Sequence, residues 1–206
     1  MASRTPTTTS KATFKGGETP TTIVICGGVH DFSLTEEFVN SFVQNIKLDF
    51  YHQVCVIPQP DIAPYDVKQI DRYLKEQHKG ATTPDRLILI GFSAGVVGLL
   101  GLARKWQRQG VTIASFFAFD GWGVPLWENF PCYRLSHDLF THQTSHWLGG
   151  NPECFYAEPD VSHLDFWGSN MSIEGYFCQR DQNDQQKQKM TIVQFLNQQL
   201  NKHQTI

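Results

Sequence analysis

The chain has 206 residues, of which 40% are hydrophobic and 13% are aromatic, so that one domain can bury a substantial core. The formal net charge is −3 and the charges are scattered, which gives no electrostatic reason to expect a nucleic-acid partner or an anionic membrane surface. No run approaches the roughly 18 apolar residues that a transmembrane segment needs.

Residues 1–20 are polar and rich in Thr and Ser, without the apolar centre of a secretory signal. We expect a flexible polar tail there and a single domain over residues 21–206. The five cysteines are an odd number and form no C-x-x-C motif. Cys26, Cys55 and Cys154 fall in or beside predicted strands, as reduced cysteines do when they serve as small core residues. These features favour a cytoplasmic protein without structural disulfides.

The first predicted strand covers residues 22–26 and ends at two glycines, Gly27 and Gly28. A helix follows, and a capping box that begins at Ser33 marks its start. Apolar residues spaced four apart give this helix one buried face, made of Leu34, Phe38, Phe42 and Ile46.

Residues 54–57 form the second predicted strand, which Pro58 and Pro60 stop. A second helix begins near Pro64 and ends at Gly80. Its inward positions are Val67, Ile70 and Leu74. The third predicted strand is the aliphatic run at residues 86–90.

A third helix runs from the end of that strand to about Gln109, and the fourth strand covers residues 112–119. The segment 122–151 breaks the rhythm, because it is irregular and rich in aromatics and histidines. A fifth strand is predicted at 153–157 and a last helix at about 191–202. The Gln- and Asn-rich stretch at 179–188 indicates a solvated loop or helix start.

The most informative motif is the run Gly91, Phe92, Ser93, Ala94 and Gly95, which follows a buried strand and opens a helix. This G-x-S-x-G pattern in a strand–turn–helix setting is typical of a serine nucleophile elbow. The turn is so tight that the positions two before and two after the serine must be small. The plainer alternative is a turn with a serine at a helix N-cap.

The alternation of strands and helices predicts an α/β fold, a three-layer sandwich around a mostly parallel sheet of about five to six strands. Ligands of such sheets bind at the carboxyl ends of the strands. The chemically interesting residues fall at those ends: the loop after the first strand, the G-x-S-x-G turn, Asp120 and His163.

These features resemble the α/β-hydrolase superfamily over residues 21–168. The run that begins His163, Leu164, Asp165 and Phe166 is similar to the catalytic-histidine block of acid-lipase-like members. The resemblance implies a Ser–acid–His triad in that chain order and an oxyanion hole made of backbone N–H groups. Full members have about eight strands, so the antiparallel opening strands and one late strand are expected to be missing here.

Ser93 is the predicted nucleophile and needs a base within hydrogen-bond reach. Among the eight histidines we assign this role to His163, which follows the last predicted strand. The acid is Asp120, which ends the fourth strand and keeps the chain order. Two rivals stay open: Asp160, which forms a D-x-x-H pattern with His163, and Glu158.

The resemblance places the oxyanion donors at the backbone N–H groups of Ala94 and Val29. Substrate contacts are expected from Gly28, His30, Phe92 and Trp122. Segment 122–151 is interpreted either as a lid-like aromatic insertion over Ser93 or as an extra packing layer. His142 and His146 are four apart, with His137 nearby, but this spacing matches no established motif, so no metal is assigned.

The sequence therefore predicts a serine hydrolase that cleaves a small-molecule ester or thioester, an acyl chain being one candidate group, without a cofactor. Acyl transfer on the same triad is an alternative. A non-catalytic ligand-binding protein on the same scaffold, or a partner interface formed by the aromatic segment, are others.

Overall fold

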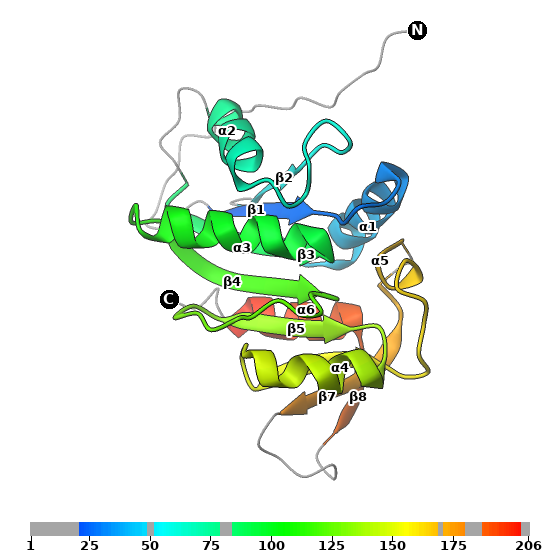
Figure 1. Ribbon diagram of the computed structural model, residues 1–206. Coiled ribbons are helices and arrows are strands. Elements are labelled where there is room, and N and C mark those ends of the chain that lie inside the picture. The colour runs from blue at the N-terminus through cyan, green and yellow to red at the C-terminus, as the bar shows by residue number, and fades with distance from the viewer. Residues whose placement is uncertain (1–20, 49–51, 79–83, 169–170, 180–186, 203–206) are drawn as a thin grey trace, which may run out of the picture.

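The computed structural model of the protein describes residues 21–48, 52–78, 84–168, 171–179 and 187–202. In these ranges eight strands form one mixed sheet with the order β2-β1-β3-β4-β5-β6-β7-β8 (Figure 1). The parallel strands are β1 (Thr21–Cys26), β2 (His52–Val56), β3 (Arg86–Phe92), β4 (Thr112–Phe119), β5 (Cys132–Ser136) and β6 (Glu153–Ala157). The antiparallel strands are β7 (Glu174–Gln179) and β8 (Gln188–Thr191).

The α/β class is confirmed, but the predicted count of five to six strands is wrong. The three strands that the sequence did not reveal are β5, β7 and β8. The last two of them follow β6 as an antiparallel extension, so the late part of the sheet is present and the sheet is mixed.

Helices cover both faces of the sheet (Figure 1). One face carries α2 (Val67–Gln77), α3 (Ala94–Gln107) and α4 (Leu139–Ser145). The other face carries α1 (Phe32–Asn45), α5 (Asp165–Gly168) and α6 (Ile192–Lys202). Alternate residues of β1 serve the two cores: Ile23 and Ile25 pack toward α1, whereas Val24 and Cys26 pack toward α2 and α3.

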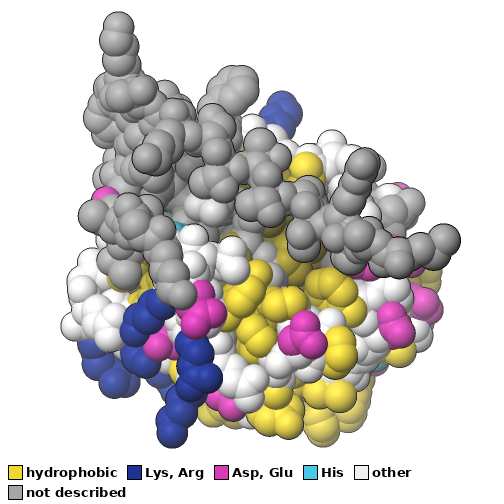
Figure 2. Space-filling view, turned by 90° about the horizontal axis from the view of Figure 1, so that it is seen from above, with side chains coloured by type: hydrophobic (Ala, Val, Ile, Leu, Met, Phe, Trp, Pro, Cys, Tyr) yellow, Lys and Arg dark blue, Asp and Glu magenta, His cyan; other side chains and the backbone are white. Residues whose placement is uncertain are grey.

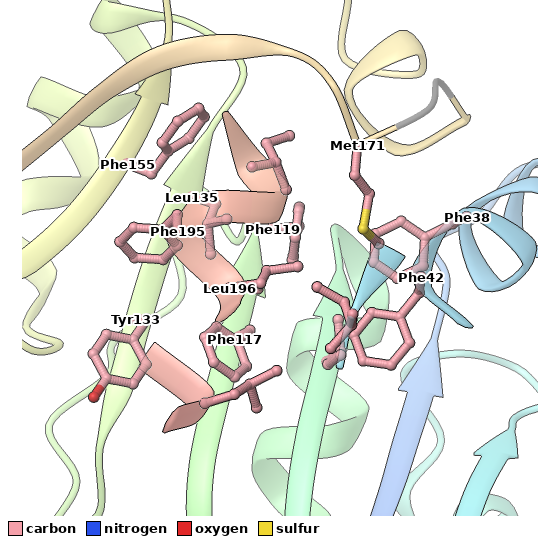
Figure 3. Close-up of a cluster of buried hydrophobic side chains, with 14 of the residues drawn as sticks. Phe38, Phe42, Phe117, Phe119, Tyr133, Leu135, Phe155, Met171, Phe195 and Leu196 are labelled. Carbon is pink, nitrogen blue, oxygen red and sulfur yellow. The ribbon is translucent and has the colours of Figure 1, made fainter. Parts of the chain in front are cut away.

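The core beneath α1 and α6 is strongly aromatic (Figure 3). Phe38 and Phe42 of α1 lie on one side of the cluster, and Phe195 and Leu196 of α6 lie among the side chains of β4, β5 and β6. All four side chains are fully or almost fully buried. The inward face predicted for α1 is confirmed at Phe38 and Phe42 because they fall one turn apart on the same side of the helix.

Segment 122–151 contributes a strand to the main sheet. It contains β5, which pairs with β4 and β6, then α4 and the 3₁₀ turn η1 (His146–Leu148). The strand was hidden because Arg134 interrupts its apolar run. Arg134 is only 5% exposed, and its guanidinium donates hydrogen bonds to the backbone oxygens of Gly121, Val124, Leu148 and Gly149.

The start of α1 also differs from the prediction. Asp31, and not Ser33, is the N-cap, and its side chain accepts a hydrogen bond from the backbone N–H of Ser33 at 2.9 Å.

The predicted stop at Gly80 and most of the Gln- and Asn-rich stretch lie outside the described residues, as does the predicted tail at 1–20. All five cysteines are buried, and none of them forms a disulfide.

Charged side chains are distributed unevenly over the surface. Figure 2 shows most of the Lys and Arg side chains of the viewed face at its lower left, with one more at the top. Asp71 of α2 forms an ion pair of 3.0 Å with Lys75 of the same helix. A second pair of 2.9 Å, between Asp71 and Lys105 of α3, links the two helices. Within the described ranges, no helix combines the length and apolar character needed to cross a membrane.

Candidate active site

Ser93 occupies the tight turn between β3 and α3. Its backbone has φ 51° and ψ −118°, a conformation that L-residues rarely adopt and that costs roughly 1–3 kcal/mol. A hydrogen bond of 2.9 Å from the Ser93 N–H to the Phe119 carbonyl holds the turn against the end of β4. Strain of this kind persists only where the surrounding fold enforces it, which makes the turn a candidate functional feature.

The two flanking glycines are required by close packing. A Cβ atom at Gly95 would lie 2.3 Å from the Gly27 carbonyl oxygen, and one at Gly91 would lie 2.9 Å from the Cα of Val96. Both obstacles are backbone atoms, so a side chain at either position displaces a main-chain segment. The sequence-based argument that these positions must be small is confirmed.

Asp120 follows β4 and also has a positive φ, of 47°. Asp120 is only 5% exposed. One carboxylate oxygen, Oδ1, accepts a 2.9 Å hydrogen bond from the backbone N–H of His137. The other, Oδ2, lies 2.8 Å from Nδ1 of His163, and the ring N–H donates to it. Asp120 is therefore held from two sides and aims one oxygen at the imidazole.

His163 lies in the loop between β6 and α5. Its ring stacks on Phe92 with 4.6 Å between the centroids, and its side chain is 43% exposed. Phe92 is fully buried and also stacks on Trp167, so it forms a rigid support beneath the imidazole. The contact with Asp120 fixes Nδ1 and leaves Nε2 as the free ring nitrogen.

The rival acids lie away from this contact. Asp160 and Glu158 are exposed, and neither forms a hydrogen bond or ion pair with His163 within the described part of the chain. Asp165 instead accepts a hydrogen bond of 2.6 Å from the Ser162 hydroxyl at the start of α5. The geometry thus selects Asp120 as the partner of the imidazole.

His137 belongs to the same cluster, although the sequence argument left it among the unassigned histidines. Its Nδ1 lies 2.9 Å from Oδ2 of Asp120, without hydrogen-bond geometry, and its ring meets that of His163 edge-on at 5.9 Å. It directly follows β5. The rule that functional residues gather at carboxyl ends of strands would have found it, had β5 been recognised.

The loop after β1 is organised by His30. The Gly28 N–H donates to Nε2 of His30 at 2.9 Å, and Nδ1 of the same ring lies 2.8 Å from the Asp31 carbonyl. Gln59 donates to the Gly28 carbonyl at 2.6 Å. Both His30 ring nitrogens are used within the loop, so the side chain positions the backbone here. A Cβ at Gly28 would lie 2.9 Å from that of Ser93.

A pocket of about 380 Å³ opens at the carboxyl ends of β3, β4 and β5. The predicted site residues Ser93, Ala94, Asp120, Trp122 and His163 all line it. Four other predicted residues do not: Gly28, Val29, His30 and Phe92. The side chain of Ser93 makes no hydrogen bond to any described residue, so its hydroxyl is free to turn within the pocket.

Four pocket residues were not predicted from the sequence: Val97, Val124, His137 and Thr141. Val97 lies one turn beyond Ser93 on α3 and is 46% exposed. Thr141 comes from α4, which the sequence pattern did not reveal. With Trp122 and Val124, Val97 gives the pocket an apolar wall.

The ligand atoms of Asp120, His137 and His163 all lie within 4.8 Å of one another, a spacing that would also suit a metal ion. A second group with metal-ligand spacing, His142, Cys154 and Cys178, lies elsewhere on the sheet. The first group has an alternative explanation, because each oxygen of the Asp120 carboxylate already accepts a hydrogen bond, from the His137 N–H and from the His163 ring.

No protein-family model matches this chain, and no curated protein matches it. The functional assignment therefore depends on the geometry of the pocket.

Proposed function

We propose that the protein is a serine hydrolase of the α/β-hydrolase type that cleaves an ester or thioester. The observation that carries the proposal is the 2.8 Å contact between Asp120 Oδ2 and His163 Nδ1, beside a pocket that Ser93 also lines. A carboxylate on one ring nitrogen leaves the other as the base, which is the arrangement that activates a serine hydroxyl.

In the proposed reaction, Ser93 Oγ attacks the substrate carbonyl while Nε2 of His163 takes the hydroxyl proton. The Asp120 carboxylate stabilises the resulting imidazolium. The leaving group departs with the proton from His163, and the acyl group stays on Ser93. Water then attacks the acyl-enzyme with His163 as base, and the free acid and Ser93 are regenerated.

The developing oxyanion accepts hydrogen bonds from backbone donors. Ala94 lines the pocket at the N-terminus of α3, where the helix dipole also favours negative charge. The second donor we propose is the Val29 N–H, on the loop that reaches Ser93 through Gly28. The Gly28 N–H is excluded because it donates to His30.

The pocket favours substrates with an apolar acyl group. Val97 and Trp122 are 46% and 63% exposed although they are apolar, and both line the cavity beside Ser93. An acyl chain or ring would remove that surface from water, at a gain of about 25 cal/mol per Å² of buried apolar area. Acyl transfer to an acceptor other than water would use the same residues. We also propose a cytoplasmic setting, which suits five buried cysteines that form no disulfide.

Hydrolysis of p-nitrophenyl esters by the purified protein tests this proposal. The parent should release p-nitrophenol catalytically, and Ser93→Ala should reduce the rate to that of buffer. Ser33→Ala, which removes an exposed hydroxyl outside the pocket, is the matched control and should retain the parent rate. Equal activity of parent and Ser93→Ala would reject the serine mechanism. A folded, inactive parent would favour the ligand-binding alternative.

A further inference from the structure

A second chemical cluster lies on the antiparallel extension of the sheet, outside the pocket of Ser93. Cys154 on β6 is paired in register with Cys178 on β7, and their Sγ atoms are 3.0 Å apart. His142 of α4 places Nε2 3.6 Å from Cys178 Sγ. The three ligand atoms all lie within 4.8 Å of one another.

The surroundings hold these side chains in place and exclude most water. Cys154 is 5% exposed and Cys178 is 8% exposed. The His142 ring stacks on Tyr156, two residues along β6 from Cys154, with 5.0 Å between centroids. This stacking orients the imidazole so that Nε2 faces the sulfur atoms. The cluster therefore joins one helix to two strands.

The surroundings shift the pKa of Cys178 downward, whereas burial raises the pKa of Cys26, Cys55 and Cys132. The hydrogen bond from Cys154 lowers the pKa of Cys178 to about 5 despite burial, with His142 and Lys187 adding to the effect. Burial alone raises the pKa of Cys26 to about 12. The thiolate that these contacts favour is the form of cysteine that ligates metals.

A disulfide is the obvious alternative, and the strand register disfavours it. The Glu158 N–H donates to the Glu174 carbonyl, which makes these opposed residues a hydrogen-bonded pair. Pair types alternate along an antiparallel ladder, so the Cys154–Cys178 pair, four residues away in register, is of the same type. Opposed Cβ atoms in such pairs lie toward the upper end of about 4.5–5.5 Å, whereas a disulfide requires roughly 3.5–4.5 Å.

We propose that His142, Cys154 and Cys178 form a binding site for a thiophilic divalent cation of the Zn²⁺ type. Two thiolates and one neutral imidazole neutralise the 2+ charge, and water completes a tetrahedron. Binding requires both cysteines as thiolates and releases to solvent any thiol proton that they still carry. Zn–S bonds of about 2.3 Å place two sulfur atoms roughly 3.8 Å apart, which requires only a small opening of the present pair.

A metal ion bound by these three residues would cross-link α4 to β6 and β7. Because α4 also supplies Thr141 to the pocket of Ser93, the cation would stabilise one wall of that pocket. The assignment stands on the geometry of the cluster and does not depend on the proposed hydrolase activity.

Cobalt substitution in the reduced full-length protein tests the site. Titration of the parent with Co²⁺ should give thiolate-to-cobalt charge-transfer absorption that saturates at one ion per chain, and Zn²⁺ should displace it. Cys178→Ser should weaken Co²⁺ binding at least tenfold, whereas Cys55→Ser, a buried cysteine on the edge strand β2, should leave it unchanged. A folded, reduced parent without this absorption overturns the proposal, as does absorption that persists in Cys178→Ser.

A measurement on the parent alone covers the case in which Cys178→Ser fails to fold. Zn²⁺ should slow alkylation of Cys154 and Cys178, measured by peptide mass spectrometry, and leave the rates at Cys26 and Cys132 unchanged. Equal rates with and without Zn²⁺ contradict the site. A Cys154–Cys178 disulfide in the purified protein, with no metal uptake after its reduction, also contradicts it.

Discussion

Ser93 and Asp120 are the two non-glycine residues with positive φ in the described part of the chain, and they end adjacent strands, β3 and β4. The Ser93 N–H donates to the carbonyl of Phe119, the residue before Asp120. The two strained turns therefore support each other and present a hydroxyl and a carboxylate to the same pocket. His163 contacts the carboxylate from a third segment.

Asp120→Asn should lower the turnover of p-nitrophenyl esters by about 10³–10⁴-fold. The amide is similar in size to the carboxylate, but it removes the negative charge that orients and stabilises the His163 imidazolium. Steady-state kinetics on the folded variant measures the effect. Asp160→Asn is the matched control, since Asp160 is exposed, and should retain activity within about twofold. Greater damage from Asp160→Asn would assign the acid to that residue instead.

Trp122→Ala should reduce the preference for longer acyl chains. The indole is 63% exposed at the pocket, and its Nε1 donates to Thr144 Oγ1 at 2.9 Å, which fixes the ring. Its loss removes apolar surface that a chain would cover, so kcat/KM for a longer ester should fall by about tenfold, equivalent to roughly 1.4 kcal/mol. The rate for the acetate should change little. An equal loss for all chain lengths would argue against an acyl-binding role.

Gly95→Ala should destabilise the protein by about 1–3 kcal/mol or more, measured by urea unfolding. The new methyl group would meet two backbone oxygens, of Gly27 and Cys26, at 2.3 and 2.4 Å. Gly101→Ala on the same helix is the comparison, because its Cβ would meet only the Val67 side chain. If both variants lose the same stability, the backbone approach at the elbow is looser than described.

Arg134→Met should lower the free energy of unfolding by about 2–4 kcal/mol, because it removes the buried guanidinium that donates hydrogen bonds to four backbone carbonyls. The guanidinium holds the backbone on both sides of β5, at Gly121 and Gly149 among others. Arg108→Met, at an exposed position after α3, should stay within about 0.5 kcal/mol of the parent. A similar small change for Arg134→Met would show that its hydrogen bonds contribute little net stability.

The elements that the sequence revealed are those whose apolar pattern is unbroken. Strands β1, β3 and β4 are buried on both faces and appear as continuous aliphatic or aromatic runs. The pattern failed at β5, where Arg134 is buried through hydrogen bonds to loop backbone, a compensation that no local pattern reveals. It also failed at β8, which consists mostly of polar residues, and at its antiparallel partner β7.

The candidate site divides in the same way. Ser93, Asp120 and His163 each follow a strand that the sequence predicts, so the rule for carboxyl ends of strands located them. His137 was missed together with β5. The role of His30 required three-dimensional information, because its two ring contacts are to the backbone of its own loop. The pairing of Cys154 with Cys178 depends on the register of β7, which the sequence did not predict.

Covalent trapping tests the central claim most directly. The purified protein should react with a fluorophosphonate to give a single adduct, which peptide mass spectrometry places on Ser93. His163→Ala should suppress adduct formation at Ser93 by removing the base. An adduct on another residue, or none on a folded parent, would contradict the account.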